Sequence, residues 1–316
     1  MGNKAFEQKL AALETLQSAA EFRKALGDRN NYYVSKAAAM VAARSLAELI
    51  PDLLAAFDRF MIDPVKTDPQ CWAKNAIAKS AKELGLDDAS FYLRGMKHVQ
   101  LEPVWGGEAD TAGTLRGICA FALTQCSIPR AEAMRHLIDL LGADKEKIVR
   151  VDAARAIAQL GGIESVLLLR LKSLTGDPEP EVVGQCFAGL LDLAPTDYIP
   201  FVANFLSAGT DVHSEAAAAL GELPDPAAVA ALTEHFGKSK DPETRRAILL
   251  SLGASRLEPA RDFLLATLEK GGVDDAIACV RALAVSRFRD EVRDRVTALT
   301  KERDEPRLTA ALHSEF

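Results

Sequence analysis

A short sequence pattern recurs along the whole chain and constrains its fold more than any other feature. Between Val149 and Ile157, small or apolar residues stand at positions 1, 5, 8 and 9, which is the spacing of one helix face. Position 5 recurs at Ala38, Ile77, Cys119, Ala153, Cys186, Ala216, Ile248, Cys279 and Ala310. The successive spacings are 39, 42, 34, 33, 30, 32, 31 and 31 residues. This near-constant period predicts a repeat protein in which each repeat is one supersecondary unit.

Most copies of the pattern follow a second helical segment that carries larger apolar residues. Met134, Leu137 and Leu141 form one such segment, and Phe263, Leu264 and Leu268 form another. Each unit is therefore predicted to be a hairpin of a first helix, A, and a second helix, B. Turns and helix N-caps are predicted at 176–178, 209–211, 224–226 and 241–243. We expect an all-α, right-handed α-solenoid (a superhelix) of about nine helix hairpins without a sheet, and a single domain over 1–316.

The repeat is less regular in the first third of the chain. Residues 1–112 are predicted to hold irregular N-terminal repeats, and residues 113–316 to hold regular repeats and a C-terminal cap. The spacing of 42 residues comes from an insertion at about 101–112, which contains Trp105 and two adjacent glycines. We expect Trp105 to be buried as a plug over the neighbouring repeats. A binding loop is the alternative, because insertions in solenoids often lie on a binding face.

Several copies of helix B begin with an acid that stands six residues before a base. These pairs are Asp144 and Arg150, Asp110 and Arg116, and Asp68 and Lys74. Together with the paired small residues that follow, this pattern resembles the HEAT-repeat family, especially its shorter variety with a period near 30. The resemblance implies an α-solenoid with a concave surface for partners. We interpret the acid–base pairs as a structural ladder between stacked repeats, since ion-pair networks often resemble functional sites.

Composition and charge exclude several classes of protein. The net charge of -7 and the pI near 5.4 argue against a general binder of nucleic acid or anionic membranes. No apolar run is long enough to cross a membrane, and no signal peptide is recognised. The five cysteines form no CxxC pair, so we expect a reduced, cytoplasmic setting. Those at position 5, Cys119, Cys186 and Cys279, are predicted to be small buried hydrophobic residues.

No catalytic, cofactor-binding or metal-binding residues are predicted. The motifs GxSxG, GxxxxGK[ST] and HExxH do not occur in the sequence. Some HEAT-like hydroxylases bind iron through repeated His-Glu dipeptides. Here the segments 213–215 and 313–315 both read His-Ser-Glu, and the intervening serine argues against such a site.

The exposed stripe of helix B is the predicted interaction surface. Positions 3 and 7 lie away from the core and carry a mixture of Phe, Met, Leu and Arg, which favours a protein or peptide groove over a phosphate track. The candidate partner-binding residues are Lys79, Trp105, Phe121, Arg155, Arg246, Leu250 and Arg281. We therefore predict a non-catalytic scaffold or adaptor that binds a protein or peptide, with no membrane partner; the sequence does not give the oligomeric state.

Two alternatives follow from the resemblance. Short HEAT-like repeats also occur in lyases that attach bilin pigments, for which Asp152, Glu215, His213 and Tyr198 are loose acid–base candidates. Other HEAT-like proteins bind DNA and excise alkylated bases. Because the chain is acidic and its predicted concave stripe is positive only in patches, we predict weak or absent binding to duplex DNA at about 150 mM salt.

Overall fold

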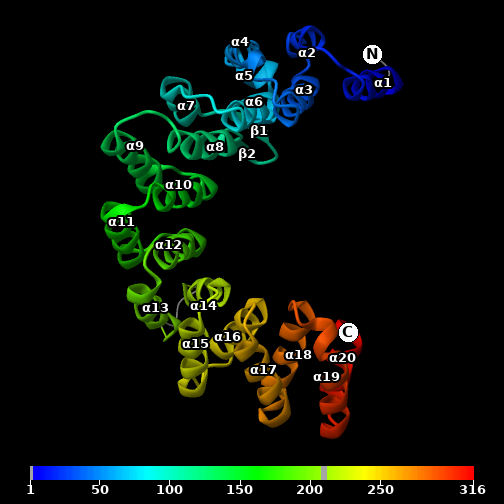
Figure 1. Ribbon diagram of the computed structural model, residues 1–316, viewed down its shortest axis with the longest axis vertical. Helices are drawn as coiled ribbons and strands as arrows, with labels where there is room; N and C mark the ends of the chain where they lie inside the picture. The colour runs from blue at the N-terminus through cyan, green and yellow to red at the C-terminus, as the bar shows by residue number, and fades with distance from the viewer. Residues whose placement is uncertain (1–2, 208–211) are drawn as a thin grey trace. The chain divides into compact units, whose positions relative to one another are not determined.

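The computed structural model describes residues 3–207 and 212–316 (Figure 1). These residues form α-helices, which are joined by short turns, and one small sheet. The chain divides into two compact units, Met1–Leu160 and Gly161–Phe316. The turn predicted at 209–211 lies outside the described residues.

The first unit is a stack of helix hairpins. Its helices are α1 (Asn3–Glu14), α2 (Ala19–Leu26), α3 (Asn31–Ala43), α4 (Ile50–Phe60), α5 (Pro64–Thr67), α6 (Trp72–Glu83), α7 (Ala89–Met96), α8 (Gly113–Leu123), α9 (Arg130–Ala143) and α10 (Lys147–Leu160), with short 3-10 helices η1 (Ala47–Leu49) and η2 (Pro69–Cys71). The hairpins pair α2 with α3, α4 with α6, α7 with α8 and α9 with α10. The second helices α3, α6, α8 and α10 pack on one another in chain order.

The second unit repeats this arrangement more regularly. Its helices are α11 (Gly162–Thr175), α12 (Pro180–Leu193), α13 (Pro195–Ala203), η3 (Asn204–Ser207), α14 (Val212–Glu222), α15 (Pro226–Lys238), α16 (Pro242–Ala254), α17 (Glu258–Lys270), α18 (Val273–Val285), α19 (Arg289–Arg303) and α20 (Pro306–Glu315). The second helices α12, α14, α16, α18 and α20 form one layer, and the first helices α13, α15, α17 and α19 form the other (Figure 1). In the described residues the two units hold nine hairpins, and the all-α prediction is confirmed.

Local sequence signals set the ends of the helices. The side chain of Asp225 accepts a hydrogen bond from Ala227 N at 2.8 Å, and that of Asp241 accepts one from Thr244 N at 2.7 Å. Both are N-caps, and each is followed by a proline at the first helical position, where the missing N–H costs nothing. The turns predicted at 224–226 and 241–243 are therefore confirmed.

Small residues on the second helices form the core between repeats. The position-5 residues from Ala38 to Cys279 are fully buried, whereas Ala310 on α20 is exposed. A Cβ atom at Gly253 would lie 2.6 Å from Ala282 O, so α16 and α18 approach each other backbone to backbone at this point. The prediction that the position-5 cysteines are small buried residues is confirmed, and burial raises the pKa of the Cys186 thiol to about 12.

The insertion forms a small sheet and exposes Trp105, and neither feature was predicted. It forms an antiparallel hairpin of β1 (Leu101–Val104) and β2 (Gly107–Asp110), so the expectation of no sheet was wrong here. Trp105 is fully exposed, at 102% of its reference area, and is not a buried plug. The pairing of Val104 with Gly107 leaves Trp105 and Gly106 as a two-residue turn. The turn therefore holds the tryptophan at the tip of the hairpin, outside the pairing that anchors the strands.

Candidate functional site

The acid–base pairs form the predicted ladder between repeats. Arg116 donates from Nη1 to Asp110 Oδ2 and from Nε to Asp144 Oδ2, both at 2.7 Å, so it links its own repeat to the next one. In the second unit, Arg245 Nη2 lies 2.5 Å from Asp275 Oδ2 of the following second helix. Bidentate guanidinium–carboxylate pairs of this kind fix geometry as well as charge. The structural interpretation is confirmed for Arg116, and Arg245, which has no acid six residues before it, makes a further link between repeats.

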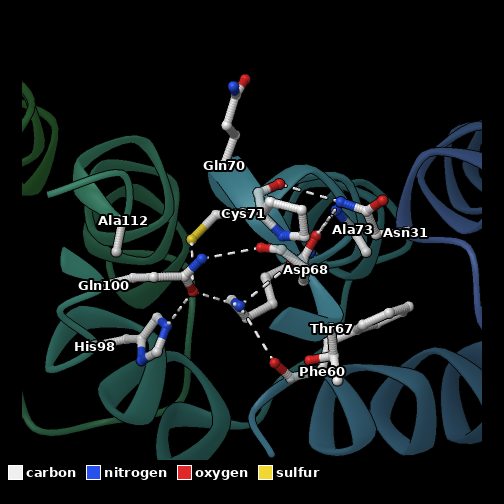
Figure 2. Close-up of polar contacts among 12 residues, drawn as sticks. Asn31, Phe60, Thr67, Asp68, Gln70, Cys71, Ala73, His98, Gln100 and Ala112 are labelled. Atoms are coloured by element: carbon white, nitrogen blue, oxygen red, sulfur yellow. Dashed lines mark hydrogen bonds and ion pairs between the residues drawn. The ribbon is translucent and has the colours of Figure 1, made fainter. Parts of the chain in front are cut away.

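In the second hairpin, a lysine takes the place of the ladder arginine and is fully buried. Lys74 Nζ lies 3.3 Å from Asp68 Oδ2, and both side chains have no exposed surface. The ammonium also donates to Phe60 O at 3.2 Å and to Gln100 Oε1 at 2.8 Å (Figure 2). Asp68 in turn accepts from the backbone N–H groups of Ala73 and Lys74. Each charge is thus compensated by a partner, as a stable buried ion pair requires.

The hairpin insertion is attached to this buried network. Glu102 Oε1 accepts from Gln70 N at 2.6 Å, from Gln100 Nε2 at 2.7 Å and from Thr111 Oγ1 at 2.7 Å. Burial would raise the pKa of Glu102, but these hydrogen bonds from Thr111, Gln70 and Gln100 hold it below its ordinary value. The base of the hairpin is therefore fixed, although its tip is exposed.

Two groups in this network resemble catalytic side chains but lack the properties for that role. Cys71 Sγ lies 3.3 Å from Gln100 Oε1, and burial raises the pKa of the thiol to about 11, so it stays protonated and unreactive at neutral pH. His98 Nε2 lies 3.2 Å from the same Gln100 oxygen (Figure 2), and burial lowers the pKa of the imidazole. We interpret the network as a structural joint between the second and third hairpins.

A groove of about 1040 Å³ opens on the second unit, across the second helices α16, α18 and α20. Its apolar lining residues are Pro242, Leu250, Val273, Ile277, Ala278, Ala310 and Ala311. Its charged lining residues are the cations Lys240, Arg245, Arg246, Arg281 and Arg307 and the acids Glu243, Asp274 and Asp275. A concave surface with an apolar floor and a few convergent polar groups is the usual form of a binding site.

The groove continues onto a fourth second helix. A smaller hollow of about 340 Å³ shares Glu243, Arg246 and Leu250 with the groove and extends to His213 and Ser214 of α14. Arg246 and Leu250 therefore lie at the centre of a concave surface that runs from α14 to α20. Leu250 exposes 41% of its surface there, although it is a large apolar residue.

The cations of the groove differ in what they bind. Arg245 belongs to the ladder, and its guanidinium also packs 3.7 Å from the centre of the Phe236 ring. Arg307 Nη2 lies 2.7 Å from Asp274 Oδ1 in an exposed pair. In the part of the chain that the structure describes, the side chains of Arg246 and Lys240 make no hydrogen bond or ion pair. Arg246 is thus an exposed, uncompensated cation at the centre of the concave surface.

The structure brings three of the predicted partner-binding residues together. Arg246, Leu250 and Arg281 all line the groove. Lys240 and Arg307 also line the groove but were not predicted, because Lys240 precedes α16 and Arg307 stands at position 2 of its repeat. Ile277, a position-3 residue, lines the groove as well.

The other four predicted residues belong to the first unit, and each has its own surroundings. Lys79 Nζ lies 3.9 Å from Glu83 Oε1 on the same helix, and Lys82 Nζ lies 5.4 Å from the centre of the Phe121 ring. The remaining two are Arg155, whose Nη1 lies 3.1 Å from Asp152 Oδ1, and Trp105 at the tip of the hairpin.

The acid–base candidates of the lyase alternative have structural surroundings. Burial raises the pKa of Asp152. Its side chain packs on α8 against Gly117 and fills the space that a Cβ atom at Gly117 would occupy. Glu215 packs on Gly184 of α12 in the same way. Both acids stand at position 4 of their repeat, so the arrangement belongs to the stacking of helices. Tyr198 lies buried in α13, in the layer of first helices.

The described residues contain neither a cluster of metal-ligating side chains nor a membrane-spanning helix. Among residues 3–207 and 212–316, no group of three or more His, Cys, Asp or Glu side chains is arranged to hold a metal ion. Within the same residues, no helix is both long enough and apolar enough to span a membrane.

Comparison with known proteins supports the repeat assignment. Residues 169–252 and 199–284 each match the family model for HEAT repeats. The matched segment, residues 169–284, therefore consists of HEAT repeats. The search of curated proteins gave no match. Among solved structures, this chain is similar to human deoxyhypusine hydroxylase in complex with glycerol, at 17% sequence identity over 80% of this chain and 91% of that one, with a TM-score of 0.30. At that score the likeness has no bearing on function.

Proposed function

We propose that this chain is a non-catalytic scaffold or adaptor that binds a protein or peptide in the groove across α14, α16, α18 and α20. The observation that carries the proposal is the groove of about 1040 Å³, in which the exposed Leu250 and the unpaired side chain of Arg246 lie where it meets the smaller hollow on α14. Arginine is enriched at protein interfaces, and three of the residues that line the groove beside its apolar side chains are arginines besides the ladder residue Arg245: Arg246, Arg281 and Arg307. Second helices that pack in register supply such a surface without any insertion.

The residues of the groove do not favour catalysis. Ser214 Oγ lies 3.3 Å from His213 Nε2 at its edge, which is the arrangement of a hydroxyl and a base. However, the two residues are neighbours on one exposed helix turn. Activation of a hydroxyl depends on fixed dipoles in a site that excludes water. We therefore assign binding, and no reaction, to this surface.

The test compares two charge insertions in a capture experiment. The full-length chain, immobilised through a tag, is incubated with lysate and then treated with a crosslinker, and the bound proteins are identified. We expect Leu250→Glu to abolish capture of the specific partner, because it places a carboxylate on the apolar floor. Leu167→Glu is the matched control: Leu167 is 57% exposed on α11, outside the groove, and its substitution should leave capture unchanged. Equal capture by wild type and Leu250→Glu, or capture of a pigment, nucleotide or metal without any protein, would contradict the proposal.

A further inference from the structure

We infer that the occupant of the groove is an acidic peptide segment of the partner, whose carboxylates bind Arg246 and Arg281 and whose apolar side chains pack on Leu250 and Ile277. The inference rests on the proposed function and specifies the chemistry of the partner. The charge of the groove differs from that of the whole chain. The whole chain has a net charge of -7, yet the groove is lined by five cations and three acids.

The arginines at positions 3 and 7 are the ones available to a ligand. The side chain of Arg246 makes no ion pair or hydrogen bond within residues 3–207 and 212–316. Arg281 Nε lies 3.7 Å from Glu315 Oε1, with 54% and 33% of the two side chains exposed. That distance is too long for a hydrogen bond, and exposed pairs contribute little to stability. Arg281 can therefore exchange Glu315 for a ligand carboxylate at small cost.

The four residues form an alternating pattern of charge and apolar surface. Arg246 and Leu250 are one helical turn apart on α16, and Ile277 and Arg281 are one turn apart on α18, in the opposite order. The register of the two helices follows from contacts described above, in which α18 residues meet α16 residues about thirty positions earlier. In that register Arg246 and Ile277 lie within about two residues of the same level, as do Leu250 and Arg281, so charged and apolar side chains alternate between the two helices. A peptide with acidic and apolar residues in alternation complements this surface on both counts.

Nucleic acid fits the same surface less well. Glu243 and Asp274 line the groove among the cations and would repel a phosphate backbone. The lining contains no aromatic side chain on which a base could stack. A phosphate track also needs several cations without internal partners, and here Arg245 and Arg307 are already paired. Charge complementarity combined with an apolar floor therefore favours a peptide.

The experiment selects ligands from a displayed library of random peptides of about twelve residues, panned on the full-length chain at about 150 mM salt. We expect the selected peptides to be enriched in Asp and Glu next to Leu, Ile or Phe, and depleted in Lys and Arg. For a synthetic selected peptide, Arg246→Glu and Arg281→Glu should each weaken binding at least about tenfold, as loss of a charge-assisted contact predicts. Arg256→Glu, at an exposed arginine that does not line the groove, is the matched control and should leave the affinity unchanged.

Each other outcome overturns a defined part of the account. Selected peptides that lose binding in Leu250→Glu but carry no excess of acids would overturn the acidic occupant and leave the groove as the binding surface. Peptides that bind Leu250→Glu as well as wild type, or a library that yields no binder, would overturn the proposed function too. A 20-base-pair DNA duplex is assayed under the same conditions. Sub-micromolar binding that Arg246→Ala abolishes would replace the peptide with nucleic acid.

Discussion

The two units use charged residues in opposite ways. In the first unit, one acid–base pair of the repeat pattern is buried and compensated: Lys74 and Asp68 are fully enclosed, and Gln100 joins them to the β-hairpin. In the second unit, Arg246 stands exposed on the concave surface without a protein partner. Charges that lie between repeats stabilise the stack, whereas Arg246 on the exposed stripe of the second helices is available to a ligand. The difference lies in position within the repeat and cannot be seen from residue type alone.

The largest expected effect comes from breaking the buried pair in the first unit. Lys74→Met leaves Asp68 charged and without its cation inside the protein, and should lower the free energy of unfolding by about 3–5 kcal/mol. Arg307→Met is the control: it breaks an exposed pair in the second unit and should change stability by no more than about 0.5 kcal/mol. Both are measured by urea denaturation. Equal effects of the two substitutions would remove the distinction between buried and exposed charge.

A smaller effect tests the close packing of second helices in the second unit. Gly253→Ala places a Cβ against Ala282 O and should destabilise the chain by about 1–3 kcal/mol. Gly237→Ala is the matched control, because Gly237 is also helical and no atom lies within 4 Å of the added Cβ. There the gain in helix propensity should stabilise the chain by about 0.5–1 kcal/mol. Thermal unfolding that ranks the two variants the other way would contradict the observed helix contact.

The smallest expected effect is a difference in acid sensitivity. Burial would raise the pKa of Asp110, but hydrogen bonds from Gln100 N, Ala112 N and Arg116 hold it below its ordinary value. A carboxylate with a depressed pKa stabilises the fold above its unfolded pKa near 4, and that stability is lost as the pH falls through the folded pKa. Asp110→Asn should therefore destabilise at pH 7 and differ less from wild type near pH 3. Asp262→Asn, at an exposed position, should show no such convergence in urea titrations at the two pH values.

How far the sequence predicts this protein depends on how local the evidence is. The period placed every position-5 residue on a second helix, and it also placed Arg246, Leu250 and Arg281 on one exposed stripe, because helical spacing is a local property. The hairpin was not predicted, since its base is held by hydrogen bonds between distant residues such as Gln70 and Glu102. Trp105 was predicted to be buried from its residue type, but a two-residue turn at the tip decided its exposure.

The role of the groove could be predicted only in part for a related reason. Its floor follows from repeat positions 3 and 7, which the sequence gives. Lys240 precedes α16, and Arg307 is the second residue of α20, so neither stands at position 3 or 7, yet both line the groove. Which cations are already paired, as Arg245 is with Asp275, also depends on contacts between repeats. The separation of structural from available charges therefore required the structure.

Hydrogen exchange of the full-length chain, with and without a peptide selected from the library, tests the central claim most directly. The claim is that the second helices of the second unit bind the partner, whereas the β-hairpin of β1 and β2 in the first unit does not. We predict slower exchange in α16, α18 and α20 on binding, with no change in β1, β2 or the turn at Trp105, since ordered contacts raise local protection. Protection confined to the hairpin around Trp105, with α16 and α18 unchanged, would contradict the account and assign binding to the insertion.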